Sequence, residues 1–154
     1  MIFAHPHDLL NHIGEDVGVS SWVKIDQQMI NQFADATGDH QWIHVDIDRA
    51  SSEVPGGKTI AHGFLLLSLF PGLSDEFFTV ENSSYTLNYG LEKLRFTSMV
   101  PVDSRVRLRQ SIASAKMSKQ DGVRVVLNGI LEVENSERPA VVAETIRLLS
   151  LIHI

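Results

Sequence analysis

Apolar and polar residues alternate along two segments in the second half of the chain, residues 85–96 and 105–109. This period of two is typical of half-buried β-strands, which point one face at a core and the other at solvent. In the second segment the polar positions are arginines. The apolar positions of the pattern are Tyr85, Leu87, Tyr89, Leu94, Phe96, Val106 and Leu108.

Turn-forming residues divide this half of the chain into successive strands. Gln120, Asp121 and Gly122 lie between two long strand-like runs, as the turn of a hairpin does. Residues 135–139 separate a run that ends near Glu134 from the last run, Ala140 to Ile154. This order predicts an antiparallel meander.

The first half is predicted to be mainly helical. Asp26 is a suitable N-cap, and Gly38 lies where a helix often ends in the left-handed conformation. The residues between them that share one helical face are Met29, Ile30, Phe33, Ala34 and Thr37. The segment from Asp39 to Val45 is too short and mixed to predict an element, whereas Asp46 to Ser52 suits a short helix before the turn at residues 55–57.

The longest apolar segment runs from Ile60 to Leu73 and is shorter than the roughly 20 residues that span a bilayer. From Ala61, the sequence AHGFLLLSLF is apolar on nearly all sides, as expected of a helix that other structure encloses. A central helix followed by long strands predicts an α+β fold in which an antiparallel sheet curls around the helix, the hot-dog fold. With 154 residues, we expect residues 1–154 to form a single domain.

Composition excludes several classes of function. The net charge of -6 argues against nucleic acid or an anionic membrane as the main partner, because both select basic surfaces. The absence of cysteine excludes thiolate catalysis and fits a cytoplasmic protein. The N-terminal MIFAHPHDLL has no basic region followed by a long apolar stretch, so we expect no secretory signal.

Asp39 and His44 are the strongest candidates for acid/base chemistry. They lie five positions apart across a short irregular segment, so a carboxylate and an imidazole can face one water molecule. Near pH 7 a neutral imidazole accepts a proton, and a carboxyl group can accept or return one. The structural alternative is that Asp39 caps the next turn and His44 is a satisfied core or surface histidine.

Gly63 and His62 open the predicted central helix. The Gly63 amide is among the first of that helix, which lack intrahelical acceptors, so it can hold a carbonyl oxygen that gains negative charge. The alternative is a glycine that permits close packing between helix and sheet. His62 is otherwise a packing or capping histidine. Although His5, His7, His40 and Asp46 add further ligand types, their spacing matches no standard metal motif, and we predict no metal.

Two linked motifs, ADATGDHQWIHVD at residues 34–46 and GGKTIAHGFLLLSL at residues 56–69, closely resemble the MaoC-like dehydratases, the R-specific enoyl-CoA hydratase family (hydratase 2). Within that family the chain looks most like the nodulation-protein-N-like branch. Residues 88–108 also resemble the strand region of the family. The positions that match the family pattern are Gly38, Asp39, Ile43, His44, Asp46, Ala61, His62 and Gly63.

The resemblance implies that Asp39 and His44 are the catalytic pair and that the Gly63 amide binds the thioester carbonyl. It also implies a homodimer, or a dimer of dimers, with active sites near the subunit interface. Gln41 and Trp42 replace the usual Asn and Pro of the motif, and Pro71 replaces a polar residue found in some members. The bulk of Trp42 affects the shape of the acyl pocket, so Trp42 and His62 are predicted to contact the substrate.

The leading hypothesis is reversible addition of water to a trans-2-enoyl thioester, giving the R-3-hydroxyacyl thioester, with coenzyme A as the carrier and no cofactor. A small acyl thioester is then the partner, with neither nucleic acid nor membrane. One alternative is a thioesterase, because hot-dog proteins include such enzymes. Another is a non-catalytic acyl-binding or dimerisation subunit, against which the retention of both Asp39 and His44 argues.

Overall fold

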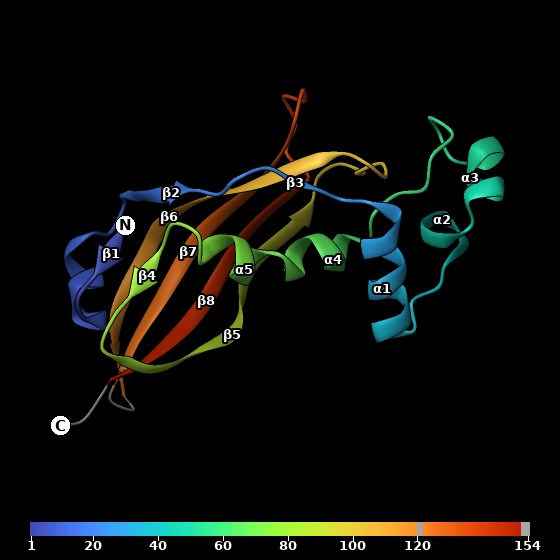
Figure 1. The fold of residues 1–154 in the computed structure, drawn as a ribbon. Coiled ribbons are helices and arrows are strands. Elements are labelled where there is room, and N and C mark those ends of the chain that lie inside the picture. The colour runs from blue at the N-terminus through green and yellow to red at the C-terminus, as the bar shows by residue number, and fades with distance from the viewer. Residues whose placement is uncertain (120–121, 152–154) are drawn as a thin grey trace.

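The structure is a computed structural model and describes residues 1–119 and 122–151 of the chain. Within these residues a six-stranded antiparallel sheet forms the body of the molecule (Figure 1). Its strands follow the order β2-β6-β7-β8-β5, and β3 (Val23–Lys24) pairs with β6 beside β2. The bounds of the ordered strands are Asp16–Val19 for β2, Arg105–Ser118 for β6, Gly122–Val133 for β7, Val141–Leu151 for β8 and Ser83–Phe96 for β5.

Two short consecutive helices, α4 (Gly63–Ser68) and α5 (Phe70–Ser74), cross the inner face of this curved sheet (Figure 1). Leu65, Leu66 and Phe70 are buried there among apolar side chains of β6, β7 and β8. Phe70 packs directly on Gly129 of β7, where a Cβ atom would lie only 2.6 Å from its ring. The predicted α+β fold, with a sheet curled around a central helix, is therefore confirmed.

The other helices lie together at one end of the sheet (Figure 1). They are α1 (Gln27–Thr37), α2 (Trp42–Val45) and α3 (Ile47–Glu53). The predicted caps of α1 are confirmed, because Asp26 accepts a hydrogen bond from the Met29 amide and Gly38 has φ +82°. At the other end of the molecule, β1 (Ile2–Phe3) pairs with β4 (Thr79–Val80), and a 3-10 helix spans Pro6–Asn11.

The structure corrects the strand order. Strands β6, β7 and β8 form the predicted antiparallel meander, but β5 pairs with β8 rather than with the next strand along the chain. The segment 97–104 after β5 must therefore cross to the far side of the sheet. Of the predicted hairpin turn, Gln120 and Asp121 lie outside the described residues, as do residues 152–154 of the last predicted strand.

The prediction that residues 85–96 form a half-buried strand is wrong for this chain. Nearly the whole of β5 is exposed, and its apolar side chains include Tyr85 at 58%, Leu87 at 51% and Tyr89 at 65% exposure. The reason is that β5 is the last strand of the sheet and has a partner strand on one side alone among the described residues. The alternating pattern predicted the strand correctly, but it did not predict that its apolar side chains are exposed.

Two expectations for the helices also need correction. Residues 39–45 were predicted to lack an element, but Trp42–Val45 form the single turn α2. The central helix is not enclosed on all sides, because Phe64 is 63% exposed and Ser68 is exposed as well. No helix in the described residues is both long enough and apolar enough to cross a membrane.

Candidate active site

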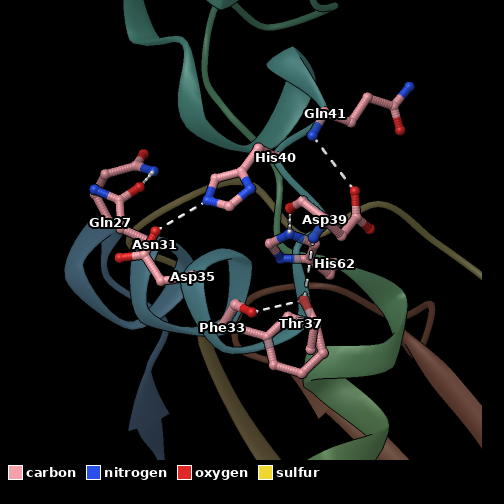
Figure 2. Close-up of polar contacts among 9 residues, drawn as sticks. All are labelled: Gln27, Asn31, Phe33, Asp35, Thr37, Asp39, His40, Gln41 and His62. Atoms are coloured by element: carbon pink, nitrogen blue, oxygen red, sulfur yellow. Dashed lines mark hydrogen bonds and ion pairs between the residues drawn. The ribbon is translucent and has the colours of Figure 1, made fainter.

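The site lies where the end of α1, the turn α2 and the start of α4 meet. Gly38 ends α1 in the left-handed conformation, so the chain turns sharply and places Asp39 just beyond the helix. The Asp39 side chain is exposed, and its nearest polar contact is the Gln41 amide, which donates to Oδ1 at 3.4 Å (Figure 2). That contact is long for a hydrogen bond and makes Asp39 a weak cap at most.

His44 lies on α2 and is buried, with 6% of its surface exposed. Its Nδ1–H donates to the backbone carbonyl of Ile60 at 2.7 Å, which fixes the ring and leaves Nε2 without a proton in the neutral imidazole. The amide of Ile60 in turn donates to the carbonyl of Ile43 at 3.0 Å. These two bonds tie α2 to the segment that leads into α4.

A polar side chain of α1 also holds α2 in place through a hydrogen bond. Gln27 donates through Nε2 to the carbonyl of His44 at 2.8 Å, and its Oε1 accepts a hydrogen bond from Thr59 at 2.6 Å. Thr59 is almost fully buried, with 1% exposure. A turn as short as α2 has little stability of its own, so these tertiary bonds hold His44 in place.

His62 lies immediately below Asp39 (Figure 2) and is 2% exposed. Its Nε2–H donates to the backbone carbonyl of Asp39 at 3.0 Å, while Nδ1 has no partner in the described part of the chain. The ring stacks on His44, with centroids 3.8 Å apart, and packs at a tilt against Phe33 of α1. The structure thus places His62 as a support between Asp39 and His44.

Asp39 and His44 come together as the sequence predicts. One carboxylate oxygen of Asp39 and one ring nitrogen each of His44 and His62 all lie within 4.8 Å of one another. A water molecule between the Asp39 carboxylate and the imidazole of His44 would be within reach of both. The same three groups are of the types that bind a divalent metal, so this is where a metal would compete for the site.

Burial lowers the pKa of His44 below its ordinary value, because the imidazolium ion loses hydration in the protein interior. The bond to Ile60 acts in the opposite direction, and the stacked ring of His62 lowers the pKa further. His44 is therefore neutral near pH 7 and able to accept a proton. By contrast, a hydrogen bond from the exposed His40 to Asp35 raises the pKa of His40.

His44 and Gly63 line one cavity of about 560 Å³. Gly63 is the first residue of α4, and a Cβ atom there would lie 2.9 Å from the ring of Phe96 on β5. The close-packing alternative for this glycine therefore has direct support. It does not exclude the carbonyl-binding role, because Gly63 also lines the cavity and close packing of the glycine leaves its backbone amide in place.

Trp42 does not line the cavity that His44 and Gly63 line. Its ring packs under the guanidinium of Arg49, which lies 4.0 Å from the ring centroid. His62 is likewise absent from the cavity lining among the described residues. Substrate contact by Trp42 and His62 therefore stays a prediction.

Several residues that line the cavity were missed from the sequence. They come from the end of β5, from the loop after it and from the loop between β7 and β8, and they are Phe96, Thr97, Ser98, Met99 and Arg138. The sequence predicted residues 135–139 as a separator between strands and nothing more. Their position depends on pairing between distant strands, so no local signal marks them.

Comparisons with known proteins agree with the fold and the motifs. A family model described as MaoC like domain matches residues 8–134. The chain is 49% identical over 139 residues to 3-hydroxyacyl-thioester dehydratase Z of Mycobacterium tuberculosis, covering 90% of this chain and 91% of the relative. It is 39% identical over 146 residues to Nodulation protein N of Rhizobium meliloti, covering 92% and 88% of the two chains.

Among solved structures, the (R)-hydratase from A. caviae involved in PHA biosynthesis superposes with a TM-score of 0.69. The match covers 90% of this chain and 97% of that one, at 20% sequence identity. At so low an identity the likeness concerns the fold alone. It confirms the predicted hot-dog fold.

Proposed function

The chain belongs to the MaoC-like dehydratase family, and from that membership we propose that it is a hydro-lyase that hydrates trans-2-enoyl thioesters or dehydrates the corresponding 3-hydroxyacyl thioesters. The family resemblance read from residues 34–46 and 56–69 is thereby confirmed. The finer proposal is an enoyl-CoA substrate and the R-3-hydroxyacyl product. One observation carries it: Asp39 lies within 4.8 Å of His44, and His44 lines a cavity together with Gly63.

In the proposed reaction, a water molecule lies between the Asp39 carboxylate and Nε2 of His44. As the water oxygen bonds to the β-carbon, His44 accepts one of its protons, and the electron pair of the double bond moves toward the thioester. The Gly63 amide donates to the carbonyl oxygen that gains this charge. The α-carbon then takes a proton from the same pair, which restores the neutral imidazole and the carboxylate.

The neutral state of His44 supports its part as the base. Because Nδ1–H is committed to Ile60, Nε2 carries the lone pair that can accept a proton. The Asp39 carboxylate orients the water and stabilises the imidazolium that forms. Arg138, an exposed cation that lines the same cavity, offers a contact for the phosphates of coenzyme A.

We also propose a homodimer, or a dimer of dimers, formed along β5. Five apolar side chains of this edge strand each have an exposed fraction of 40–65%. They are Tyr85, Leu87, Tyr89, Leu91 and Phe96. An unpaired edge with such a surface favours pairing with a second copy. Since Phe96 packs on Gly63, the second copy would lie close to the proposed active site.

The proposed function can be tested by adding purified protein to an enoyl thioester and measuring the absorbance of the conjugated thioester over time. Crotonyl, hexenoyl and longer enoyl-CoA substrates are offered in turn, and free thiol is measured in parallel. Loss of the absorbance without thiol release supports hydration. Release of thiol in step with that loss would instead indicate a thioesterase, and no change with any chain length would favour a non-catalytic acyl-binding subunit.

A further inference from the structure

Arg147 on β8 is a buried arginine that the proposed reaction does not use. Its exposure is 8%, and its guanidinium makes no hydrogen bond or ion pair within residues 1–119 and 122–151. Burial lowers its pKa, which the charge of Asp75 opposes, and the ring of Phe78 lies 6.0 Å from the guanidinium. Arg147 is mostly buried yet lines two open hollows, so an anion that enters them can pair with its guanidinium.

Arg147 lies where two hollows beside the central helices meet. One hollow, of about 400 Å³, has apolar walls from Leu67, Phe70 and Leu91. The other, of about 390 Å³, is more polar and reaches Asp75. Pro71, Asn88 and Arg147 line both.

Thr145 is a second polar residue that lines the first hollow. The hydroxyl of Thr145 is buried and has no hydrogen-bond partner in the described part of the chain. Thr145 and Arg147 are two positions apart on β8, so their side chains project from the same face of the strand. Thr145 lines the apolar hollow beside Arg147, so a rotation of its side chain would present the unpartnered hydroxyl to a ligand that Arg147 binds.

We propose that Arg147 and Thr145 form a binding site for a carboxylate that carries an apolar tail, with the tail lying against Leu67 and Phe70. The planar guanidinium matches the two oxygens of a carboxylate, and the Thr145 hydroxyl can donate to one of them. The negative charge of Asp75 nearby favours a single anionic charge over a phosphate dianion.

This site is distinct from the cavity of the proposed reaction, since the two have no lining residue in common. Both nevertheless lie along α4 and β5. From Gly63 to Pro71 the helices advance roughly 12 Å, at about 1.5 Å per residue. The carboxylate can therefore belong to a free fatty acid or to the far end of an acyl thioester.

Calorimetric titration with decanoate tests the site without any need for turnover. Wild-type protein should bind decanoate, and Arg147→Gln should weaken binding about tenfold or more, because a charge-assisted hydrogen bond is lost. Thr145→Val, which keeps the shape of the side chain, should weaken it to a smaller extent. Lys116→Gln removes an exposed cation of β6 and should bind as wild type does, and decanol should not distinguish wild type from Arg147→Gln.

The source of the carboxylate is resolved by two saturated thioesters that cannot be hydrated, decanoyl-CoA and the CoA monothioester of decanedioic acid. If Arg147→Gln weakens binding of the second alone, the site receives the end of a thioester; if it weakens decanoate alone, the ligand is a free acid. The proposal is overturned if wild type binds neither carboxylate, or if Arg147→Gln and Thr145→Val both bind them as wild type does. A clear fall in the melting temperature of ligand-free Arg147→Gln also counts against it, because the guanidinium would then already be paired in the assembled protein.

Discussion

The imidazole rings of His44 and His62 stack with their centroids 3.8 Å apart and their planes inclined by 25°. Each ring donates one N–H to a backbone carbonyl, His44 to Ile60 and His62 to Asp39. The neighbouring ring helps to lower the pKa of His44, because two stacked imidazolium ions would repel each other. His62 therefore contacts both members of the proposed pair. It holds the backbone of Asp39 and favours the neutral form of His44.

Two substitutions of His62 test these effects. His62→Phe keeps a ring against His44 but loses the bond to the Asp39 carbonyl, whereas His62→Gln keeps a donor and loses the stack. We expect kcat to fall about tenfold in His62→Phe, because the Asp39 carboxylate is less well held. Both variants lose the electrostatic effect of His62 that lowers the pKa of His44, so in both the acid limb of the kcat/KM profile should move to higher pH. His40→Gln is the control, and unchanged kcat and pH profiles in both His62 variants would refute the positioning role.

Asp39→Asn and His44→Gln test the proposed catalytic pair. Each should lower turnover by about 10² or more, because each removes a group that holds or moves a proton. Asp39→Asn should leave stability nearly unchanged, since its side chain is exposed and its contact with Gln41 is long. His44→Gln should also cost about 1–3 kcal/mol of unfolding free energy, because the buried bond to Ile60 is weakened or lost.

Kinetics per folded molecule, with denaturation curves alongside, separate the two effects. The double variant should lose less activity than the product of the two single losses, as expected of groups that act on one water molecule. Near-wild-type hydration by either folded single variant would exclude that residue from the pair.

The lowered pKa of His44 predicts a dependence of stability on pH. The ordinary pKa of about 6.5 applies to the unfolded chain, which therefore takes up a proton before the folded chain does as the pH falls. The contribution of His44 is fully present above about pH 6.5 and is lost as the pH falls through that value toward the lower folded pKa. Denaturation with urea between about pH 5 and 8 measures the slope.

His44→Gln should remove that part of the slope. The raised pKa of His40 has the opposite sign, because its contribution is present at low pH and disappears as the pH rises through the folded pKa. His40→Gln should accordingly steepen the loss of stability at acid pH. A slope that His44→Gln leaves unchanged would mean that His44 is not held neutral by burial.

Local signals in the sequence predicted local structure well. Asp26 and Gly38 mark the ends of α1 because capping depends on residues within one turn of each end. The pairing of β5 with β8 joins residues that are far apart in the sequence, such as Ser83 and Leu151. No short sequence pattern predicts such a pairing. The exposure of Tyr89 could not be predicted either, because alternation reports which side chains are apolar and not whether another element covers them.

The same distinction applies to the site. The proximity of Asp39 and His44 was predictable because they are only five positions apart and follow the turn at Gly38, although bonds from Gln27 and to Ile60 hold His44 in place. The contact between His62 and Asp39 depends instead on how α4 docks against α1. Arg138 and Arg147 reach their cavities through strand pairing, so the sequence offered no reason to single them out.

The exposed edge strand predicts that the oligomer is sensitive to charge on β5. Leu87→Lys should raise the dimer dissociation constant about tenfold or more, because a cation would replace an apolar contact at the proposed interface. Met117→Lys is a matched control on β6, with 48% exposure compared with 51% for Leu87. Sedimentation or light scattering over a range of concentrations gives the masses. A wild-type protein that is monomeric at low micromolar concentration would rule out the dimer.

Asp39, His44 and His62 are close enough to bind a metal ion together, so the prediction that activity needs no metal can be tested at these residues. In the proposed reaction Nε2 of His44 must be free to accept a proton, and a zinc ion bound there would block it. Dialysis against a strong chelator should therefore leave hydration of crotonyl-CoA unchanged, and added zinc should inhibit it. Since a ring nitrogen of His62 is one of the three candidate ligand atoms, His62→Phe should weaken inhibition by zinc relative to His40→Gln. Activity that the chelator abolishes and zinc restores would instead make the three residues a metal centre and would replace the water-activating pair as the basis of the reaction.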